Sequence, residues 1–307
     1  MVGEKVQTGP FHILIQRDQP PRQTNPLPPG TVSLRVHSFL VIMKRLFLLV
    51  LLSGSFHATF SQTQITYVAN EGVLIETEGK KVMIDALFDK FYDQYLFPDE
   101  ALRNNMISGQ SPFDQVDLLL TTHMHRDHFE ALVTGNFLNA HQESELLSSE
   151  QIKNILAEKY SQFSAIAKRV NAHERTVETS TDEINGIIVH SFFIHHAGGA
   201  RTADIENMGF VIELEGKRIL HVGDADMDLT RFSELNLAQY DIDLALIPYW
   251  YMMDEAGRQI INEQIKADQL VGIHFPISPS KLALQEIAAH YPEARVFKKA
   301  FESIRLD

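Results

Sequence analysis

The chain has 307 residues, of which 44% are hydrophobic and 22% are charged; this composition is typical of a globular protein with a full core and excludes wholesale disorder. It carries 27 lysines and arginines against 40 aspartates and glutamates, a formal net charge of −13, and so acidic a chain argues against a nucleic acid as partner because it repels phosphate backbones. It contains no cysteine, which excludes disulfides and thiol nucleophiles and leaves His, Asp and Glu to hold any metal ion.

The first 61 residues have the features of a leader and not of a folded domain. Residues 20–30 are rich in proline and have no periodic apolar pattern. Met43-Lys44-Arg45 precedes the apolar run 46–52 and the small residues 53–55, which is the layout of a signal peptide. The apolar run is short for a transmembrane helix, and a membrane anchor or a buried strand are the alternative interpretations.

We therefore expect three segments. Residues 1–42 are expected to be a disordered or non-native upstream extension with Met43 as the true start, residues 43–61 a signal peptide, and residues 62–307 one folded domain. A cut after Ser61 would leave Gln62 as the first residue of an exported protein, periplasmic or extracellular, with no stable membrane anchor after processing.

Short apolar runs separated by turn residues predict strands from residue 65 onward. Glu78-Gly79-Lys80 predicts a tight hairpin turn, and the continuous apolar run 116–121 is typical of a strand buried on both faces. Ser148-Ser149-Glu150-Gln151 indicates a capping box, and the apolar stripe that follows predicts a helix continuing to Val170. The predicted strands are Ile65–Ala69, Val73–Thr77, Val82–Ile84, Val116–Thr121, Ile187–Ile194, Phe210–Leu214, Ile219–Val222, Ile242–Ile247 and Val271–His274.

The second half of the domain echoes the first. Residues 72–84 and 209–221 share the pattern of a strand, a Glu-Gly-Lys turn and a second strand, and an apolar strand beginning with aspartate follows each, at Asp117 and Asp243. The shared order favours an internal duplication over convergence of common hairpin turns. Two such halves predict a pseudo-twofold sandwich of two β-sheets.

The strongest chemical pattern lies directly after the apolar run 116–121. His123, His125, Asp127 and His128 form the spacing HxHxDH. Polar side chains at the end of a buried strand are costly unless they are paired or bind a metal ion, and imidazole with carboxylate is a ligand set for Zn, Fe or Mn. A solvated loop is the weaker interpretation, because this ordered spacing is far more specific than a histidine pair.

With these motifs, residues 62–307 resemble the metallo-β-lactamase fold superfamily. The resemblance implies an α+β fold, an αββα four-layer sandwich of two mixed β-sheets packed face to face with helices outside, and a dinuclear site at one edge. The family's other motifs are matched by Asp85 after the early hairpin, by Gly223-Asp224, and by strand-end histidines at His195-His196 and His274.

The resemblance also implies a role for each matched residue. Asp85 is expected to orient a ligand histidine, and Asp224 to bridge the two metal ions. Of His195 and His196, we favour His196, because neighbouring strand residues point to opposite faces and the chain leaves the strand there. The expected ligands are His123, His125 and His196 for the first ion, Asp127, His128 and His274 for the second, and Asp224 for both.

The second half lacks such a motif, since Pro248-Tyr249-Trp250-Tyr251 stands where the first half has its histidines. We expect one site per chain, with these aromatic residues at its rim or in the core. The remaining histidines of the domain are expected in the core or on the surface and not as ligands: His141, His173, His190, His221 and His290.

Two metal ions that share a water lower its pKa to about 7, and the resulting hydroxide attacks a carbonyl or phosphoryl centre. The expected activity is metal-dependent hydrolysis of an ester, lactone, amide or phosphodiester bond in a small molecule or lipid. Two Zn²⁺ ions, with Mn²⁺ or Fe²⁺ as alternatives, are the expected cofactors, and Asp127 is expected to accept or relay the proton. The alternative is an iron-dependent oxidoreductase of the sulfur dioxygenase type; the sequence leaves substrate, native metal and oligomeric state open.

Overall fold

The computed structural model describes residues 62–306. The expected upstream extension over residues 1–42 and the expected signal peptide over 43–61 lie outside the described residues. No helix within 62–306 is both long enough and apolar enough to cross a membrane.

The first sheet contains seven strands in the order β14-β1-β2-β3-β4-β5-β6. β1 to β3 are joined by antiparallel hairpins, β3 to β6 run parallel, and β14 pairs antiparallel with β1. This sheet therefore joins the first and last strands of the domain. Its strands are β1 (Thr63–Ala69), β2 (Gly72–Glu76), β3 (Lys81–Ile84), β4 (Leu118–Leu120), β5 (Glu145–Ser149), β6 (Val170–His173) and β14 (Ser303–Leu306).

The second sheet repeats this arrangement, with the order β13-β12-β11-β10-β9-β8-β7. β7 to β10 pair antiparallel and β10 to β13 pair parallel, so β8, β9, β10 and β11 correspond to β1, β2, β3 and β4. Its strands are β7 (Thr179–Ile184), β8 (Ile187–Phe193), β9 (Met208–Leu214), β10 (Lys217–His221), β11 (Leu244–Pro248), β12 (Gln269–Ile273) and β13 (Arg295–Val296).

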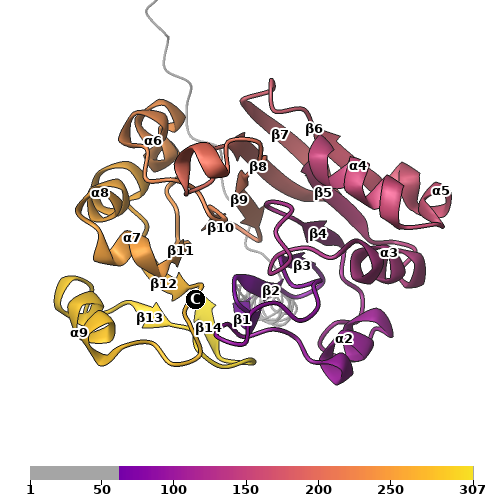
Figure 1. Cartoon of the computed structure of the whole chain (residues 1–307), viewed down its shortest axis with the longest axis horizontal. Coiled ribbons are helices and arrows are strands. Elements are labelled where there is room, and N and C mark those ends of the chain that lie inside the picture. Colours follow the sequence, from indigo (N-terminus) through magenta and orange to yellow (C-terminus); the bar gives the residue numbers. More distant parts are fainter. Residues whose placement is uncertain (1–61, 307) are drawn as a thin grey trace, which may run out of the picture. The chain divides into compact units, whose positions relative to one another are not determined.

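Helices cover the outer face of each sheet, α2–α5 on one side and α6–α9 on the other (Figure 1). A core of apolar side chains from both sheets fills the space between them, and two further cores join each sheet to its helices. These layers confirm the expected α+β sandwich. The helices are α2 (Glu100–Ile107), α3 (Ala131–Ala140), α4 (Glu150–Lys159), α5 (Phe163–Ile166), α6 (Leu229–Leu235), α7 (Tyr249–Met253), α8 (Glu255–Gln259) and α9 (Lys281–His290), with a π-helix at Ile260–Ile265 and short 3₁₀ turns at Ala167–Arg169, Gly199–Arg201 and Leu237–Tyr240.

The pseudo-twofold relation extends to individual ion pairs. In the first half, Asp117 accepts from the backbone N–H of Lys81 at 2.9 Å and pairs with Lys80 at 3.0 Å. In the second half, Asp243 accepts from the backbone N–H of Arg218 at 2.8 Å and pairs with Lys217 at 3.2 Å. The echo seen in the sequence therefore corresponds to two halves with the same local bonding.

One expected element is wrong in its extent. The predicted helix from residue 150 to Val170 ends at Lys159, because the backbone turns extended at Tyr160, and Val170 belongs to strand β6. Its cap also shifts by one residue: the hydroxyl of Ser149 accepts from the N–H of Ile152 at 3.4 Å, whereas Ser148 donates to the carbonyl of Thr121. The apolar stripe persists across the break because α4 and α5 pack against the same sheet.

A chain beginning at Gln62 is expected to fold and to keep its activity. Strand β1 begins at Thr63, is almost entirely buried, and pairs with both β2 and β14, so the folded sheet starts immediately after the expected cleavage point. Circular dichroism and a chelator-sensitive hydrolysis assay on the shortened chain would check this. An insoluble shortened chain beside a soluble full-length one would show that the leader is part of the fold.

Candidate metal centre

The first half contributes four polar side chains through the loop after β4. Buried Leu118–Leu120 leads into the HxHxDH segment, whose turn is closed by hydrogen bonds from the N–H groups of His128 and Phe129 to the carbonyl of His125. The imidazole of His123 and the ring of His128 are fully buried, and Asp127 is nearly so. The turn thus gathers these side chains at the carboxyl end of the buried strand.

The second half contributes three residues, each placed just after a different strand. His196 follows β8, Asp224 follows β10, and His274 follows β12. Gly223, which precedes Asp224, has a φ of +60° and lies so close to Asn207 and Thr122 that a Cβ would clash with both. A glycine is therefore required where the chain turns to bring Asp224 into the centre.

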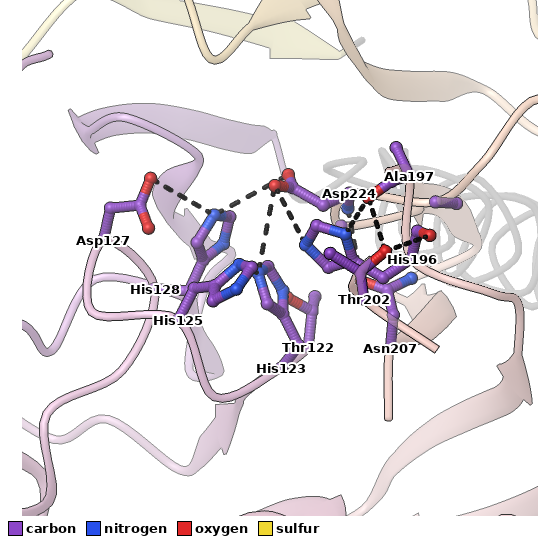
Figure 2. Close-up of polar contacts among 12 residues, drawn as sticks. Thr122, His123, His125, Asp127, His128, His196, Ala197, Thr202, Asn207 and Asp224 are labelled. Carbon is purple, nitrogen blue, oxygen red and sulfur yellow. Dashed lines mark hydrogen bonds and ion pairs between the residues drawn. The ribbon is translucent and has the colours of Figure 1, made fainter. Parts of the chain in front are cut away.

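Three of the expected ligands form one group with Asp224. Nε2 of His123 lies 3.1 Å from Nδ1 of His125, and Nε2 of His196 lies 3.5 Å from Oδ2 of Asp224. One ligand atom from each of the four lies within 4.8 Å of every other. These separations are close to the roughly 3.3 Å expected between donors on one tetrahedral ion with bonds of about 2.0–2.1 Å. Figure 2 shows these side chains converging on Asp224.

The second group lies on the other side of Asp224. Asp127, His128 and His274 place ligand atoms within 4.8 Å of one another, with Nε2 of His274 3.5 Å from Oδ2 of Asp127. Asp224 reaches this group as well, because its Oδ1 lies 3.6 Å from Nε2 of His128 and its Oδ2 lies 3.6 Å from Nε2 of His274. The carboxylate of Asp224 therefore lies between the two groups.

The carboxylates and imidazoles of the centre shift one another's pKa values. Burial lowers the pKa of the His128 imidazole, but the carboxylates of Asp224 and Asp127 outweigh burial and hold that pKa well above its usual value. Conversely, His274 and His128 overcome the burial of Asp224 and hold its pKa well below the usual range. In His123, burial and then the neighbouring His128 lower the pKa well below its usual value. The carboxylates are thus held anionic and the His123 imidazole neutral, the forms that bind metal, whereas a metal ion at His128 would have to displace a proton from its ring.

Asp85 holds the first-half loop from behind. Its Oδ2 accepts from Nδ1 of His128 at 2.8 Å and from the hydroxyl of Thr122, while its Oδ1 accepts from the Thr122 N–H at 2.8 Å. This contact leaves Nε2 of His128 free to face Asp127 and Asp224. Asp85 itself has a φ of +44°, a conformation that non-glycine residues adopt rarely and mainly where the surroundings enforce it.

Replacing Asp85 with asparagine is expected to weaken metal binding at the His128 group by about 10- to 100-fold, the usual range for partners that orient a ligand. Asparagine has one accepting oxygen where Asp85 has two, so its NH2 group must face either the N–H of Thr122 or the two donors now shared by Oδ2, and at least one of these hydrogen bonds is lost. Calorimetric titration of metal-depleted protein measures the affinity. The control is Asp89→Asn in the same loop, which removes only an exposed ion pair with Arg126; equal affinities in both variants would contradict the role of Asp85.

The structure distinguishes His196 from His195. His196 lies within the first group, whereas His195 is exposed and its Nδ1 accepts from Arg175 at 2.7 Å. All seven expected ligands are thus brought together, and that they bind metal stays a prediction. The other histidines expected outside the site have separate contacts: His141 stacks on Phe137, His173 pairs with Asp182, His190 pairs with Glu213, and His221 is buried below the centre.

The aromatic segment of the second half divides between rim and core. Tyr251 is fully buried, and its hydroxyl donates to the carbonyl of Ala225 at 2.9 Å. Trp250 is half-buried and meets His274 edge-on at 5.0 Å between ring centroids, and Tyr95 does the same from another loop at 5.0 Å. Two aromatic rings therefore flank the His274 side of the centre.

The donor set fits metal ions. Nε2 of His128, Nε2 of His196 and Oδ1 of Asp224 are buried and have no hydrogen-bond partner in the part of the chain that the structure describes. Nε2 of His128 lies 3.6 Å from Oδ1 of Asp224 and Nε2 of His196 lies 3.5 Å from its Oδ2, so these atoms face one another and not solvent. Buried polar atoms without partners are rare unless an ion or water satisfies them, and a cation would satisfy all three.

Residues 64–274 match the family described as "Beta-lactamase superfamily domain". The chain belongs to the beta-lactamase superfamily. The expected resemblance is confirmed over most of the folded domain, and the two-sheet architecture agrees with it.

Two proteins similar to this chain are described as metal hydrolases and a third as a diiron hydroxylase. A "metal-dependent hydrolase" of Pyrococcus abyssi is 26% identical over 212 residues, which cover 64% of this chain and 84% of the relative. The metallo hydrolase Igni18 of Ignicoccus hospitalis shares the fold with a TM-score of 0.56 and 15% identity, covering 80% of this chain and 99% of that chain. The diiron β-hydroxylase CmlA of Streptomyces venezuelae matches with a TM-score of 0.53 and 14% identity, covering 80% of this chain and 54% of that chain.

Three residues that lie at the centre were not predicted from the sequence. Asn207 accepts from the N–H of Asp224 at 3.2 Å and donates to the carbonyl of Val222 at 3.1 Å. Asn70 donates to Oδ2 of Asp127 at 3.1 Å, and its neighbour Glu71 is fully buried beside Asp224. No spacing connects these residues to HxHxDH, and an asparagine shortly before a predicted strand is the one sequence feature that could have pointed to Asn207.

Proposed function

We propose that this chain is a metal-dependent hydrolase with two metal ions. His123, His125 and His196 would hold one ion, Asp127, His128 and His274 the other, and Asp224 would contact both. The observation that carries the proposal is the convergence of seven buried or half-buried donors into two groups that share the Asp224 carboxylate. Zn²⁺ suits such imidazole and carboxylate ligands, with Mn²⁺ or Fe²⁺ as alternatives.

Bound metal ions supply a water of lowered pKa and polarise the oxygen of the substrate. Asp127 is the proposed acceptor of the proton that this water loses. His128 and His274 overcome its burial and lower its pKa, which keeps the carboxylate ionised. Asn70 donates to its Oδ2 at 3.1 Å and fixes the orientation of the group, which a proton acceptor requires.

The surroundings of His274 bear on the substrate. Tyr95 and Trp250 present their rings there, and aromatic surface binds apolar groups by burial. We therefore place an apolar part of the substrate on this side, in a small molecule or lipid with an ester, lactone, amide or phosphodiester bond. The net charge of −13 disfavours a nucleic acid. Export by a signal peptide over residues 43–61 is proposed with this function.

A second candidate is an iron-dependent oxidoreductase, because histidines with carboxylates also hold iron and a diiron β-hydroxylase shares the fold. Metal analysis of protein purified without added metal separates the two candidates. Two zinc or manganese ions per chain favour the hydrolase, and iron, at one or two ions per chain, favours the oxidoreductase.

The proposed function is tested with a panel of lactones, acyl esters, phosphodiesters, amides and β-lactams, assayed with and without chelator. Hydrolysis of at least one class is expected, lost on chelation and restored by added metal. Replacing His195 with alanine provides a matched control, because that histidine neighbours a proposed ligand but lies outside both groups. Hydrolysis that survives complete removal of metal would refute the proposal.

A further inference from the structure

The tip of the first hairpin is inserted below the metal centre. Asn70 and Glu71 form the two-residue turn between β1 and β2, and both are fully buried. The carbonyl of Asn70 accepts from the N–H of His274 at 3.0 Å, and the carbonyl of Glu71 accepts from Nε2 of His221 at 3.1 Å. A turn that ordinarily faces solvent is here bonded to two strands of the other sheet.

The carboxylate of Glu71 is the unusual group in this turn. It has no exposed surface, and neither of its oxygens has a hydrogen-bond partner among residues 62–306. A ligand atom of Glu71 lies within 4.8 Å of one on Asp224 and one on His274. Burying a carboxylate is costly: burial itself and then Asp224 raise the pKa of Glu71 well above its usual value, and the nearby His128 offsets this only in part.

His221, the imidazole beside Glu71, supplies no positive charge. Nε2 of His221 lies 3.9 Å from Oε2 of Glu71, but that nitrogen donates to the backbone carbonyl. Nδ1 of His221 accepts from the N–H of Gly223 at 3.1 Å, so one ring nitrogen donates and the other accepts, which is the neutral imidazole. Asp224 and Asp85 approach Glu71 on its other sides and add negative charge.

We propose that Glu71 is a further carboxylate of the metal centre, and that its charge strengthens binding of the cation held at Asp127, His128 and His274. A bound cation reverses the electrostatic balance around a buried carboxylate, and His274 and Asp224 bring this cation's site next to Glu71. The inference rests on the proposed function, because it assigns Glu71 to the second of the two proposed ions.

The test compares Glu71→Gln with the unchanged full-length chain. Glutamine keeps the size and removes the charge. Metal-depleted protein is titrated with Zn²⁺ by calorimetry, and bound zinc is counted by mass spectrometry after gel filtration. We expect the second zinc to bind at least about 10-fold more weakly, within the range for groups that support metal ligands, while the first zinc binds as before. Titration with Co²⁺ gives a second measurement: the visible absorption of Co²⁺ bound at the second site is expected to be lost in Glu71→Gln.

The matched control is Glu76→Gln at the far end of the same hairpin, where the carboxylate pairs with Lys81 at 3.3 Å; two zinc ions of unchanged affinity are expected. Unchanged affinity for both ions in Glu71→Gln would overturn the inference, whereas an unchanged chain that binds no metal would overturn the proposed function itself. Should Glu71→Gln not fold, Glu71→Asp is titrated in its place, because it keeps the charge but withdraws it by one methylene. Weaker second-site binding in that variant supports the inference, and unchanged binding overturns it.

Discussion

Replacing Asp224 with asparagine is expected to leave close to one metal ion per chain and to reduce the rate of hydrolysis by at least about 100-fold, the scale seen when a key electrostatic group is removed. Oδ2 of Asp224 lies 3.5 Å from His196 and 3.6 Å from His274, so one oxygen faces both groups. Without that negative charge, two cations at this spacing would repel each other. The second ion is expected to leave first, since the other group keeps three histidines.

The asparagine keeps the shape of the side chain, and the N–H of residue 224 remains bonded to Asn207, so the variant tests charge and not packing. Asp226→Asn is the control, because the Asp226 side chain lies outside both groups and accepts from the N–H of Met227 at 2.9 Å. Metal content by mass spectrometry and initial rates measure both variants. If Asp226→Asn lost metal while Asp224→Asn retained two ions, the shared carboxylate would be misassigned.

Replacing His123 or His125 with alanine is expected to abolish detectable hydrolysis and to lower metal content by roughly one ion per chain, because each change removes one of the few ligands of a metal site. The two imidazoles face each other at 3.1 Å within the group that contains His196. The remaining donors cannot move in to replace a lost ring, since His123 is fully buried in a packed site.

His195→Ala is the appropriate control, since it removes an exposed imidazole from the residue next to His196. Circular dichroism confirms that each variant is folded before metal is counted. Normal metal content and activity in both His123→Ala and His125→Ala would refute the site. Loss of metal in His195→Ala with retention in His196→Ala would exchange the roles of those two histidines.

The sequence predicts the first-half side of the centre well for a physical reason. HxHxDH is local, so one turn suffices to bring its donors together after the buried run of β4. The donors of the second half lie after three different strands, and only the resemblance to a known superfamily connected His196, Asp224 and His274 to the motif. Their proximity depends on strand order, which spacing along the chain does not contain.

Elements were predicted less well where the apolar pattern shows which side chains are buried but not where a helix or strand begins and ends. The apolar stripe beyond Tyr160 faces the same sheet although the helix is broken there, so periodicity could not reveal the break. Strand β7 is absent from the predicted strands, because all of its residues except Ile184 are polar and no apolar alternation marks it. The Asn70-Glu71 turn has the composition of a solvent-exposed hairpin, and its burial is decided by strands of the second sheet that arrive about 150 residues later.

The division of the donors between the two halves has a consequence for the stability of the chain. Each proposed ion would tie the loop after β4 to segments roughly 70 to 150 residues further along, and such long ring closures restrict the unfolded chain most strongly. In a protein without cysteine, two metal ions bound between the two halves of the domain would act as cross-links, as disulfides do in other proteins. Chelation would then remove the link between the two β-sheets as well as the catalytic activity. The melting temperature would therefore measure metal occupancy as directly as the rate of hydrolysis does.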